Sequence, residues 1–213
     1  MASAVRDLAL RHFDTSRLVL EQVLHDESLL ATLERIADLT AQAMLGGRKL
    51  MVAGNGGSAA DSQHLVAEFV SRLTVDRPAM RAVALTTDSS ILTAIGNDYG
   101  YDLVFARQIE ALGQDGDVFI GITTSGNSPN IVKALEQTKP AGITTLALTG
   151  NGGGKVAQLA DYSIVVPSAV TAHIQESHLV IEHVFCMLVE RCYFGMSYFG
   201  ETQDKELTKQ WKR

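Results

Sequence analysis

The sequence predicts an α/β fold: a doubly wound, five-stranded parallel sheet with an N-terminal helical extension. Short apolar runs alternate with helical segments after residue 48, as buried strands joined by crossover helices do. Two of these runs lead straight into a loop of glycine, hydroxyl and amide residues and then into a helix. Two long amphipathic segments precede the first run and form no part of a minimal doubly wound unit.

The N-terminal extension is predicted to consist of two helices within residues 5–45, separated at His25–Ser28. Because their apolar stripes need a partner, residues 1–47 are expected to be a helical oligomerisation segment. Residues 196–213 are polar and charged, and they are expected to form a loosely held tail or to dock on a neighbouring subunit through Trp211.

Residues 48–195 are predicted to contain the sheet and its covering helices. Ser128 followed by Pro129 predicts a helix start, with the serine as N-cap and the proline in the first turn. The predicted strands are Leu50–Ala53, Ala82–Leu85, Val118–Ile122, Thr145–Leu148 and Ser163–Val166. The predicted helices are Ala59–Arg72, Ser89–Gly96, Val104–Leu112, Pro129–Gln137 and Ile174–Tyr193.

The two polar loops, Gly54–Ser58 and Thr123–Ser128, each follow a strand and open a helix. Backbone N–H groups at a helix start, together with side-chain hydroxyls, favour an anion. Neither loop contains lysine or arginine, whereas the phosphate loop of nucleoside triphosphatases needs a lysine. Ligands of doubly wound sheets bind beyond the carboxyl ends of the strands, so both loops are expected to face one small phosphate ester.

Composition narrows the classes of function. The net charge is −6 and the pI is about 5.5, which gives no indication of nucleic acid or of an anionic membrane surface as a partner. No apolar run reaches membrane-spanning length, and no signal-peptide pattern is present. Cys186 and Cys192 are six residues apart in a predicted helix, so they should not pair, and a reducing, cytosolic compartment is expected.

His64 and Glu68 lie four residues apart in the helix after the first loop, so both project from one face. One interpretation is an ordinary surface pair. The flanking residues Leu65–Ala67, Phe69 and Val70 make the helix apolar nearly all round, however, which predicts burial. A buried histidine and carboxylate need partners, a metal or a catalytic task.

Gln175 and His183 share a face of the last predicted helix, while His178 points elsewhere. Eight residues span about 12 Å of helix axis. One metal ion is therefore reached by both only if the side chains converge or if Gln175 precedes the regular helix. The remaining histidines show no comparable pattern and are expected to be surface or hydrogen-bonded core residues. These are His12, His25, His173 and His178.

Gly54, Gly56 and Ala59 also match the dinucleotide-binding pattern after a strand. That pattern needs an acidic residue at the end of the second strand, and the nearest candidate, Asp88, comes well after this point. Dinucleotide binding also leaves the hydroxyl-rich second loop unexplained. The segment Thr93–Asp102 predicts by itself only a helix end and a turn.

In combination, these segments resemble the sugar isomerase (SIS) domain family, and within it the bacterial phosphoheptose isomerases. The resemblance covers about residues 5–195. It is carried by GNGGSAAD, the helix of His64 and Glu68, GNDYGY, TTSGNS, LTGNGGG and VPS…IQESHL. It implies a homotetramer with active sites shared between subunits, and the interconversion of sedoheptulose 7-phosphate and D-glycero-D-manno-heptose 7-phosphate.

The resemblance also implies one zinc ion per subunit and a set of site residues. The family's zinc positions correspond to His64, Glu68, Gln175 and His183. Its substrate positions correspond to Asn55, Gly56, Gly57, Glu68, Asn97, Asp98, Thr123, Thr124, Ser125, Ser128 and Gln175.

Such an isomerisation moves a carbonyl from C2 to C1 through an enediol, which needs a base at C1 and an acid at the carbonyl oxygen. Glu68 is expected to be the base and His183 its acid/base partner, or the reverse. Zinc is expected either to assist them or to be structural. A related SIS protein that binds a replication initiator lacks the carboxylate and imidazole at these two positions, and a non-catalytic protein of that kind is the alternative interpretation.

Overall fold

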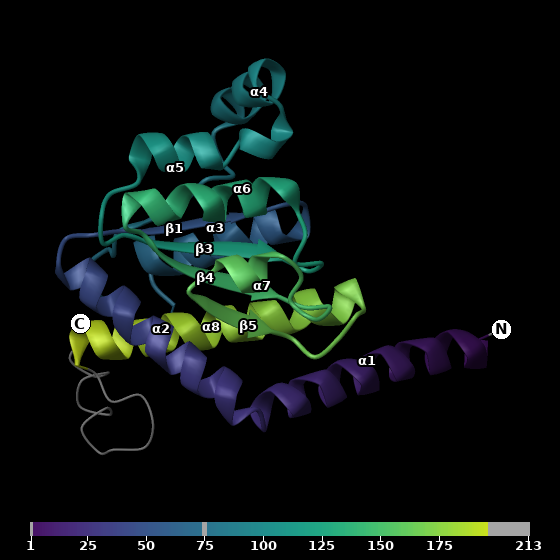
Figure 1. Cartoon of the computed structure of the whole chain (residues 1–213). Coiled ribbons are helices and arrows are strands. Elements are labelled where there is room, and N and C mark those ends of the chain that lie inside the picture. Colours follow the sequence, from purple (N-terminus) through teal and green to yellow (C-terminus); the bar gives the residue numbers. More distant parts are fainter. Residues whose placement is uncertain (1, 74–75, 196–213) are drawn as a thin grey trace.

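The computed structural model describes residues 2–73 and 76–195, and Figure 1 shows helices on both sides of a central sheet. The predicted tail, including Trp211, lies outside the described residues. Every strand pair is parallel and the strand order is β2-β1-β3-β4-β5, which confirms the doubly wound sheet. The strands are β1 (Leu50–Gly54), β2 (Ala82–Ala84), β3 (Val118–Thr123), β4 (Thr144–Thr149) and β5 (Tyr162–Val165).

Helices cover both faces of the sheet, and each face has its own apolar core. None of the described helices combines the length and the apolarity needed to cross a membrane. The helices on the first face are α2 (Glu27–Leu45), α3 (Gly57–Val70) and α8 (Thr171–Phe194). Those on the second face are α4 (Ser89–Asp98), α5 (Ala106–Leu112), α6 (Pro129–Thr138) and α7 (Val156–Leu159), with the short 3-10 helices η1 (Tyr101–Leu103) and η2 (Lys139–Ala141).

Alternate strand side chains serve the two cores, as the pleat of a strand requires. In β1, Leu50 and Val52 belong to the core on the α8 side, whereas Met51 and Ala53 belong to the opposite core. All residues of β1 and β3 are buried. Burial on both faces explains why these strands appear in the sequence as continuous apolar runs.

The strand order brings both polar loops to one point of the sheet edge. From β1 the chain crosses to β2, and it returns to β3 on the other side of β1. The parallel register pairs Leu50 with Val118 and Gly54 with Ile122. The loops after β1 and β3 therefore begin side by side, at the switch point where doubly wound folds bind ligands.

The two predicted N-terminal helices are present, as α1 (Ala2–Leu24) and α2. The Asp26 carboxylate accepts a 3.0 Å hydrogen bond from the Leu29 backbone N–H, and this cap begins α2. α2 packs into the main core, and both Leu33 and Ile36 are buried there. α1 instead extends away from the body, as Figure 1 shows, and most of its described side chains are exposed.

Two helices differ from the sequence prediction. The four-residue α7 was not predicted, because so short a segment carries no recognisable period. The expected all-round burial of α3 is wrong. One face, with Leu65 and Phe69, is buried, but the side chain of His64 is 44% exposed and Val70 is 48% exposed. A helix on a sheet buries the face that its neighbours cover, and its remaining apolar residues stay at the surface of a single chain.

A buried ion pair ties the segment after α3 to the last helix. Arg77 Nε donates to Glu190 Oε1 at 2.7 Å, and the two side chains are 2% and 0% exposed. The same guanidinium donates to the backbone carbonyls of Glu68 at 2.6 Å and Phe69 at 2.7 Å. Arg77 therefore satisfies carbonyl groups in the last turn of α3, from which the Glu68 side chain projects.

Replacing Arg77 with alanine is expected to lower the free energy of unfolding by about 3–5 kcal/mol, because Glu190 would stay buried without this cation. Urea denaturation measures the change. Arg81→Ala is the control. The exposed Arg81 guanidinium donates to the Gly47 carbonyl at 2.9 Å, and its loss is expected to cost about 0.5 kcal/mol or less. Equal losses for the two variants would contradict the special role of the buried pair.

Candidate functional site

A pair of amides joins the first polar loop to the start of α6, the helix that follows the second loop. Asn55 Nδ2 donates to Asn130 Oδ1, and Asn130 Nδ2 donates to Asn55 Oδ1, each at 2.8 Å. The Tyr101 hydroxyl also donates to Asn55 Oδ1, at 3.2 Å. Asn130 is buried at the start of α6, so the pair is a fixed bridge between the first loop and that helix. Neither Asn130 nor Tyr101 was identified as a site residue from the sequence.

The first loop is shaped by its glycines. A Cβ added to Gly54 would lie 2.3 Å from the backbone oxygen of Ser58, so the chain approaches itself too closely for a side chain. Gly56 has a φ of +57° and occupies the N-cap position of α3, where no side chain caps the helix. A Cβ added to Gly57 would lie 2.6 Å from Gln175 Nε2, so the Gln175 amide lies against this loop. The start of α3 therefore has its backbone N–H groups and the Gln175 amide close together.

The second loop is held by hydrogen bonds among its own residues. Thr123 Oγ1 and Ser128 Oγ lie 2.8 Å apart. Ser128 occupies the predicted N-cap position of α6, but its hydroxyl bonds to Thr123 and does not cap the helix. The exposed Ser125 accepts the Asn127 backbone N–H at Oγ, at 3.2 Å, while Thr124 is partly buried. The first turn of α6 thus lacks a side-chain cap, which is the condition under which a helix start favours an anion.

Gly126 fixes the second loop against a neighbouring one. Its φ is +68°, and an added Cβ would lie 2.1 Å from the carbonyl oxygen of Gly153. The Val156 backbone N–H donates to the Gly126 carbonyl at 3.0 Å. The Lys155 backbone N–H donates to Asn127 Oδ1 at 3.2 Å. The glycine-rich segment after β4 therefore supports the second loop through close backbone contact.

His64, Glu68 and His183 come together where α3 meets α8. His64 Nε2 lies 2.9 Å from His183 Nε2 and 3.5 Å from Glu68 Oε1. One ligand atom from each of the three lies within 4.8 Å of the others. Two imidazole nitrogens and a carboxylate oxygen are common zinc ligands, so these side chains fit the metal that the resemblance implies. The side chains of His64 and Glu68 are 44% and 16% exposed, so the cluster is open to solvent in one chain.

Gln175, Asn97 and Asp98 lie outside the cluster of His64, Glu68 and His183. α8 begins at Thr171, so Gln175 lies within the regular helix, about 12 Å along its axis from His183. Asn97 Nδ2 donates to Asp98 Oδ1 at 2.7 Å, and both residues are exposed at the end of α4. Figure 1 shows α4 at the outer end of the molecule, beyond α5 and α6. The predicted helix end at this segment is confirmed.

The buried side of α8 near His183 contains two ionisable groups whose charged forms are disfavoured by burial. Glu182 is 2% exposed, and neither of its carboxylate oxygens has a hydrogen-bond partner among the described residues. Burial, and to a lesser extent the charge of Asp61, raises the pKa of Glu182 to about 8. His178 Nε2 bonds to the Thr149 carbonyl at 3.2 Å, as expected of a core histidine, and burial lowers the pKa of His178 to about 4. Burial therefore favours the neutral form of both groups beside the surface cluster.

A second cluster of histidines and a carboxylate was missed in the sequence. His12 is exposed and His173 is buried and hydrogen-bonded, as expected of surface and core histidines, but the sequence did not reveal that α1 and α8 bring both beside Glu176. Burial opposes ionisation of Glu176, but hydrogen bonds from Ser16, His12 and His173 outweigh it and lower its pKa to about 2. The i,i+3 spacing of His173 and Glu176 was the local signal, whereas His12 is 164 positions from Glu176 in the sequence.

The dinucleotide-binding interpretation lacks the acidic residue that it needs. The Asp88 carboxylate accepts the Ile91 backbone N–H at 2.9 Å and caps α4. β2 ends earlier, at Ala84. A ribose-binding carboxylate belongs at the end of the second strand, so Asp88 does not complete the fingerprint.

Known proteins resemble the chain over most of its length. The family model described as SIS domain matches residues 11–150. The phosphoheptose isomerase of Aneurinibacillus thermoaerophilus is 54% identical over 190 residues, which is 89% of this chain and 96% of that protein. The solved phosphoheptose isomerase from Neisseria gonorrhoeae has a TM-score of 0.82 at 40% identity, and the one from Francisella tularensis has 0.83 at 32%. These matches cover 87% and 88% of this chain and 98% of each solved chain.

Gly126→Ala is expected to destabilise the protein more than Gly152→Ala, because only the first adds a collision with the Gly153 carbonyl. Gly152 has a φ of +75° with no atom within 4 Å of an added Cβ, so its substitution costs only backbone strain, about 1–2 kcal/mol. We expect at least about 1 kcal/mol of additional loss for Gly126→Ala, measured by chemical denaturation. Equal losses would show that the second loop yields easily and is not rigidly supported.

Proposed function

The chain belongs to the phosphoheptose isomerases, a family of SIS-domain proteins, and we propose that its two polar loops and the α3–α8 cluster form one active site. The protein is an aldose–ketose isomerase that converts sedoheptulose 7-phosphate into D-glycero-D-manno-heptose 7-phosphate. Its substrate is therefore a phosphorylated seven-carbon sugar. The alternative, a non-catalytic SIS protein that binds a replication initiator, has no support among these relatives.

The catalytic proposal is carried by the meeting of His64 and Glu68, on the helix that starts at the first loop, with His183 of α8. We assign the role of base to Glu68 and the role of acid/base partner to His183, with exchange of the roles as the variant. The base removes a proton from C1 while the C2 carbonyl oxygen gains one, which gives the enediol. A proton then leaves the C1 hydroxyl and another is delivered to C2, which completes the aldose. His64 Nε2 lies within 3.5 Å of both Glu68 and His183, so it can orient the pair.

The second loop is assigned to the phosphate and the first loop to the sugar. The hydroxyls of the second loop and the uncapped start of α6 offer neutral donors, which suit a phosphate monoester. The first loop leads into α3, so a sugar held there would lie next to the catalytic helix. The proposed substrate-binding residues are Asn55, Gly56, Gly57, Glu68, Asn97, Asp98, Thr123, Thr124, Ser125, Ser128 and Gln175.

One zinc ion per subunit is proposed, held by His64, Glu68, Gln175 and His183. Its support is the donor set of two imidazoles and a carboxylate, whose ligand atoms lie within 4.8 Å of one another. When bound, zinc would polarise the sugar carbonyl or fix the orientation of the catalytic side chains. The Gln175 amide lies against Gly57 and is the part of the set that would have to turn toward the others.

A homotetramer with shared active sites is proposed. On α1, Leu8 is 63% exposed and Phe13 is 72% exposed, an apolar surface that a subunit contact would cover. Residues 1–47 are assigned as the oligomerisation segment, 48–195 as the SIS domain and 196–213 as a tail. Since α2 is part of the core, α1 is the part of the first segment that is available for contact.

A cytoplasmic location is proposed, with no nucleic acid or membrane partner. Cys186 and Cys192 are both free thiols, as the sequence predicts, which suits a reducing compartment. The net charge of −6 provides no electrostatic attraction to polyanions or anionic lipid.

Glu68→Gln and His183→Ala are each expected to lower the rate of heptose phosphate interconversion by at least about 100-fold, because each removes a proton-transfer group. The rate is measured by following both sugar phosphates by NMR, and the oligomer by light scattering. Glu136→Gln is the matched control. Glu136 is exposed on α6, and in the contacts described it forms an ion pair only with Lys133 of the same helix. Full activity in Glu68→Gln or His183→Ala would remove that residue from the mechanism.

Removal of divalent metal with a chelator is expected to lower activity and thermal stability, and added Zn²⁺ is expected to restore both. His64→Ala should not regain activity with Zn²⁺, because one ligand is missing. His25→Gln is the control, since the His25 side chain lies at the surface and bonds only to the Glu21 carbonyl in the contacts described. Unchanged activity and melting temperature after chelation would make zinc incidental to this enzyme.

A further inference from the structure

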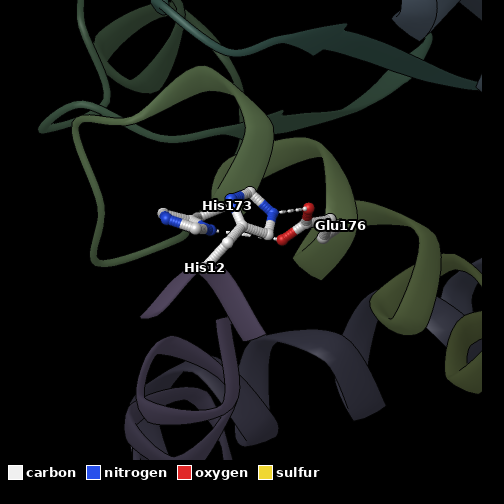
Figure 2. Close-up of side chains that lie close together, drawn as sticks. All are labelled: His12, His173 and Glu176. Atoms are coloured by element: carbon white, nitrogen blue, oxygen red, sulfur yellow. Dashed lines mark hydrogen bonds and ion pairs between the residues drawn. The ribbon is translucent and has the colours of Figure 1, made fainter. Parts of the chain in front are cut away.

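A second cluster of two histidines and a carboxylate joins α1 to α8. Figure 2 shows His12 of α1 beside His173 and Glu176 of α8. His12 Nε2 lies 2.6 Å from Glu176 Oε1, and His173 Nδ1 lies 3.2 Å from Glu176 Oε2. The centroids of the two imidazole rings are 4.5 Å apart. Three potential metal ligands from opposite ends of the chain thus converge on one point.

This cluster lies where the exposed part of α1 is attached to the body. Leu8 and Phe13 are mostly exposed, whereas Val19, further along α1, is buried in the core. A helix that is exposed on most sides gains little from apolar burial. The polar contacts that His12 and Ser16 make with α8 therefore help to hold this part of α1 beside the body.

We propose that His12, His173 and Glu176 bind a divalent transition cation, with zinc as the best match, and that this ion clamps α1 onto α8. One ligand atom from each residue lies within 4.8 Å of the others. Two imidazole nitrogens and one carboxylate oxygen suit Zn²⁺ or Co²⁺, whereas Mg²⁺ and Ca²⁺ prefer sites built mainly of oxygen. Water would complete the coordination, as it does in zinc sites with three protein ligands.

The hydrogen-bonded geometry needs only small movements to accept an ion. Ligand atoms bound to a tetrahedral zinc at about 2.0–2.2 Å are about 3.3–3.6 Å apart, compared with 2.6 Å between His12 Nε2 and Glu176 Oε1. The side chains of His12 and Glu176 are 43% and 42% exposed, so they can separate without disturbing the core. A neutral imidazole loses no proton on binding, because its N–H proton moves to the other ring nitrogen.

His173 and Ser16 make up the rigid part of the site. The His173 side chain is only 7% exposed, which restricts its ring to one orientation. Ser16 Oγ lies 2.9 Å from His173 Nδ1 and donates to Glu176 Oε2 at 2.5 Å. A hydroxyl that bonds to a ligating carboxylate orients it, as the outer partners of metal sites commonly do.

The proposed ion is separate from the zinc of the active-site proposal. Glu176 and His183 are seven residues apart, which is about 10 Å along α8. The active-site cluster contains His183 of α8 and two residues of α3. The cluster of His12 contains two residues of α8 and one of α1. Two equivalents of zinc per chain are therefore expected.

The test is the zinc stoichiometry of the full-length, tag-free protein after chelation and removal of the chelator, by calorimetric titration with Zn²⁺ and elemental analysis. We expect two equivalents for the wild type and one for His12→Gln. His183→Ala should also keep one equivalent, bound between α1 and α8. His25→Gln is the matched control and should keep two, since His25 lies outside both clusters.

Single-equivalent outcomes separate this inference from the active-site zinc. If the wild type binds one equivalent of zinc, and this binding persists in His12→Gln but is lost in His183→Ala, the α1–α8 site is overturned and the active-site zinc remains. If the wild type binds one equivalent of zinc, and this binding is lost in His12→Gln but persists in His183→Ala, the α1–α8 site is supported and the active-site zinc is rejected. No zinc bound to the wild type overturns both.

A thermal measurement checks that the ion clamps the helix. In His183→Ala, added Zn²⁺ is expected to raise the melting temperature by several degrees, since an ion that binds only the folded state stabilises it. Adding His12→Gln to this variant should abolish the rise. A rise that persists in the double variant would overturn the clamp.

Discussion

The parallel pairing of β1 with β3 is the constraint on which the rest of the structure depends. Their register sets Gly54 beside Ile122, so the two polar loops leave the sheet at one level. The reciprocal amide pair of Asn55 and Asn130 then fixes the first loop to the start of α6. Without this pairing, each loop would be an isolated helix start, which favours an anion only modestly. With it, two helix starts and a set of hydroxyls lie side by side at the switch point, where we propose that they bind one ligand.

The last helix, α8, is the second organising element, because a single rigid helix makes several separate contacts. Glu190 pairs with Arg77 in the core, and this pair fixes one end of α8 relative to the last turn of α3. Toward the other end, His183 meets the α3 cluster and the Gln175 amide lies against the first loop. Glu176 receives α1. A helix advances 1.5 Å per residue with little freedom, so a shift at any one contact would move the others.

Features with local signals could be predicted from the sequence, and features that depend on helix crossings could not. The strands, the two loops and the i,i+4 pair of His64 and Glu68 are encoded within a few residues, and the sheet order confirms the fold. Ser128 occupies the predicted N-cap position. Its hydroxyl, however, bonds to the Thr123 hydroxyl, which the fold brings close, and not to a backbone N–H group of the helix. The burial of α3 was overestimated because composition does not reveal which faces neighbours cover. The contact of His12 with α8 joins distant segments, and no local pattern records it.

The exposure of the catalytic cluster links the proposed chemistry to the proposed assembly. Proton transfer through an enediol is protected from side reactions when water is kept out, yet the His64 side chain is 44% exposed in one chain. On the inner side, Glu182 and His178 are buried, and burial disfavours the charged form of each. On the proposed assembly, the outer side is closed by the substrate and by a second subunit. The exposed apolar surface of α1 offers the area for such a contact, so on this proposal assembly completes the active site and does more than stabilise it.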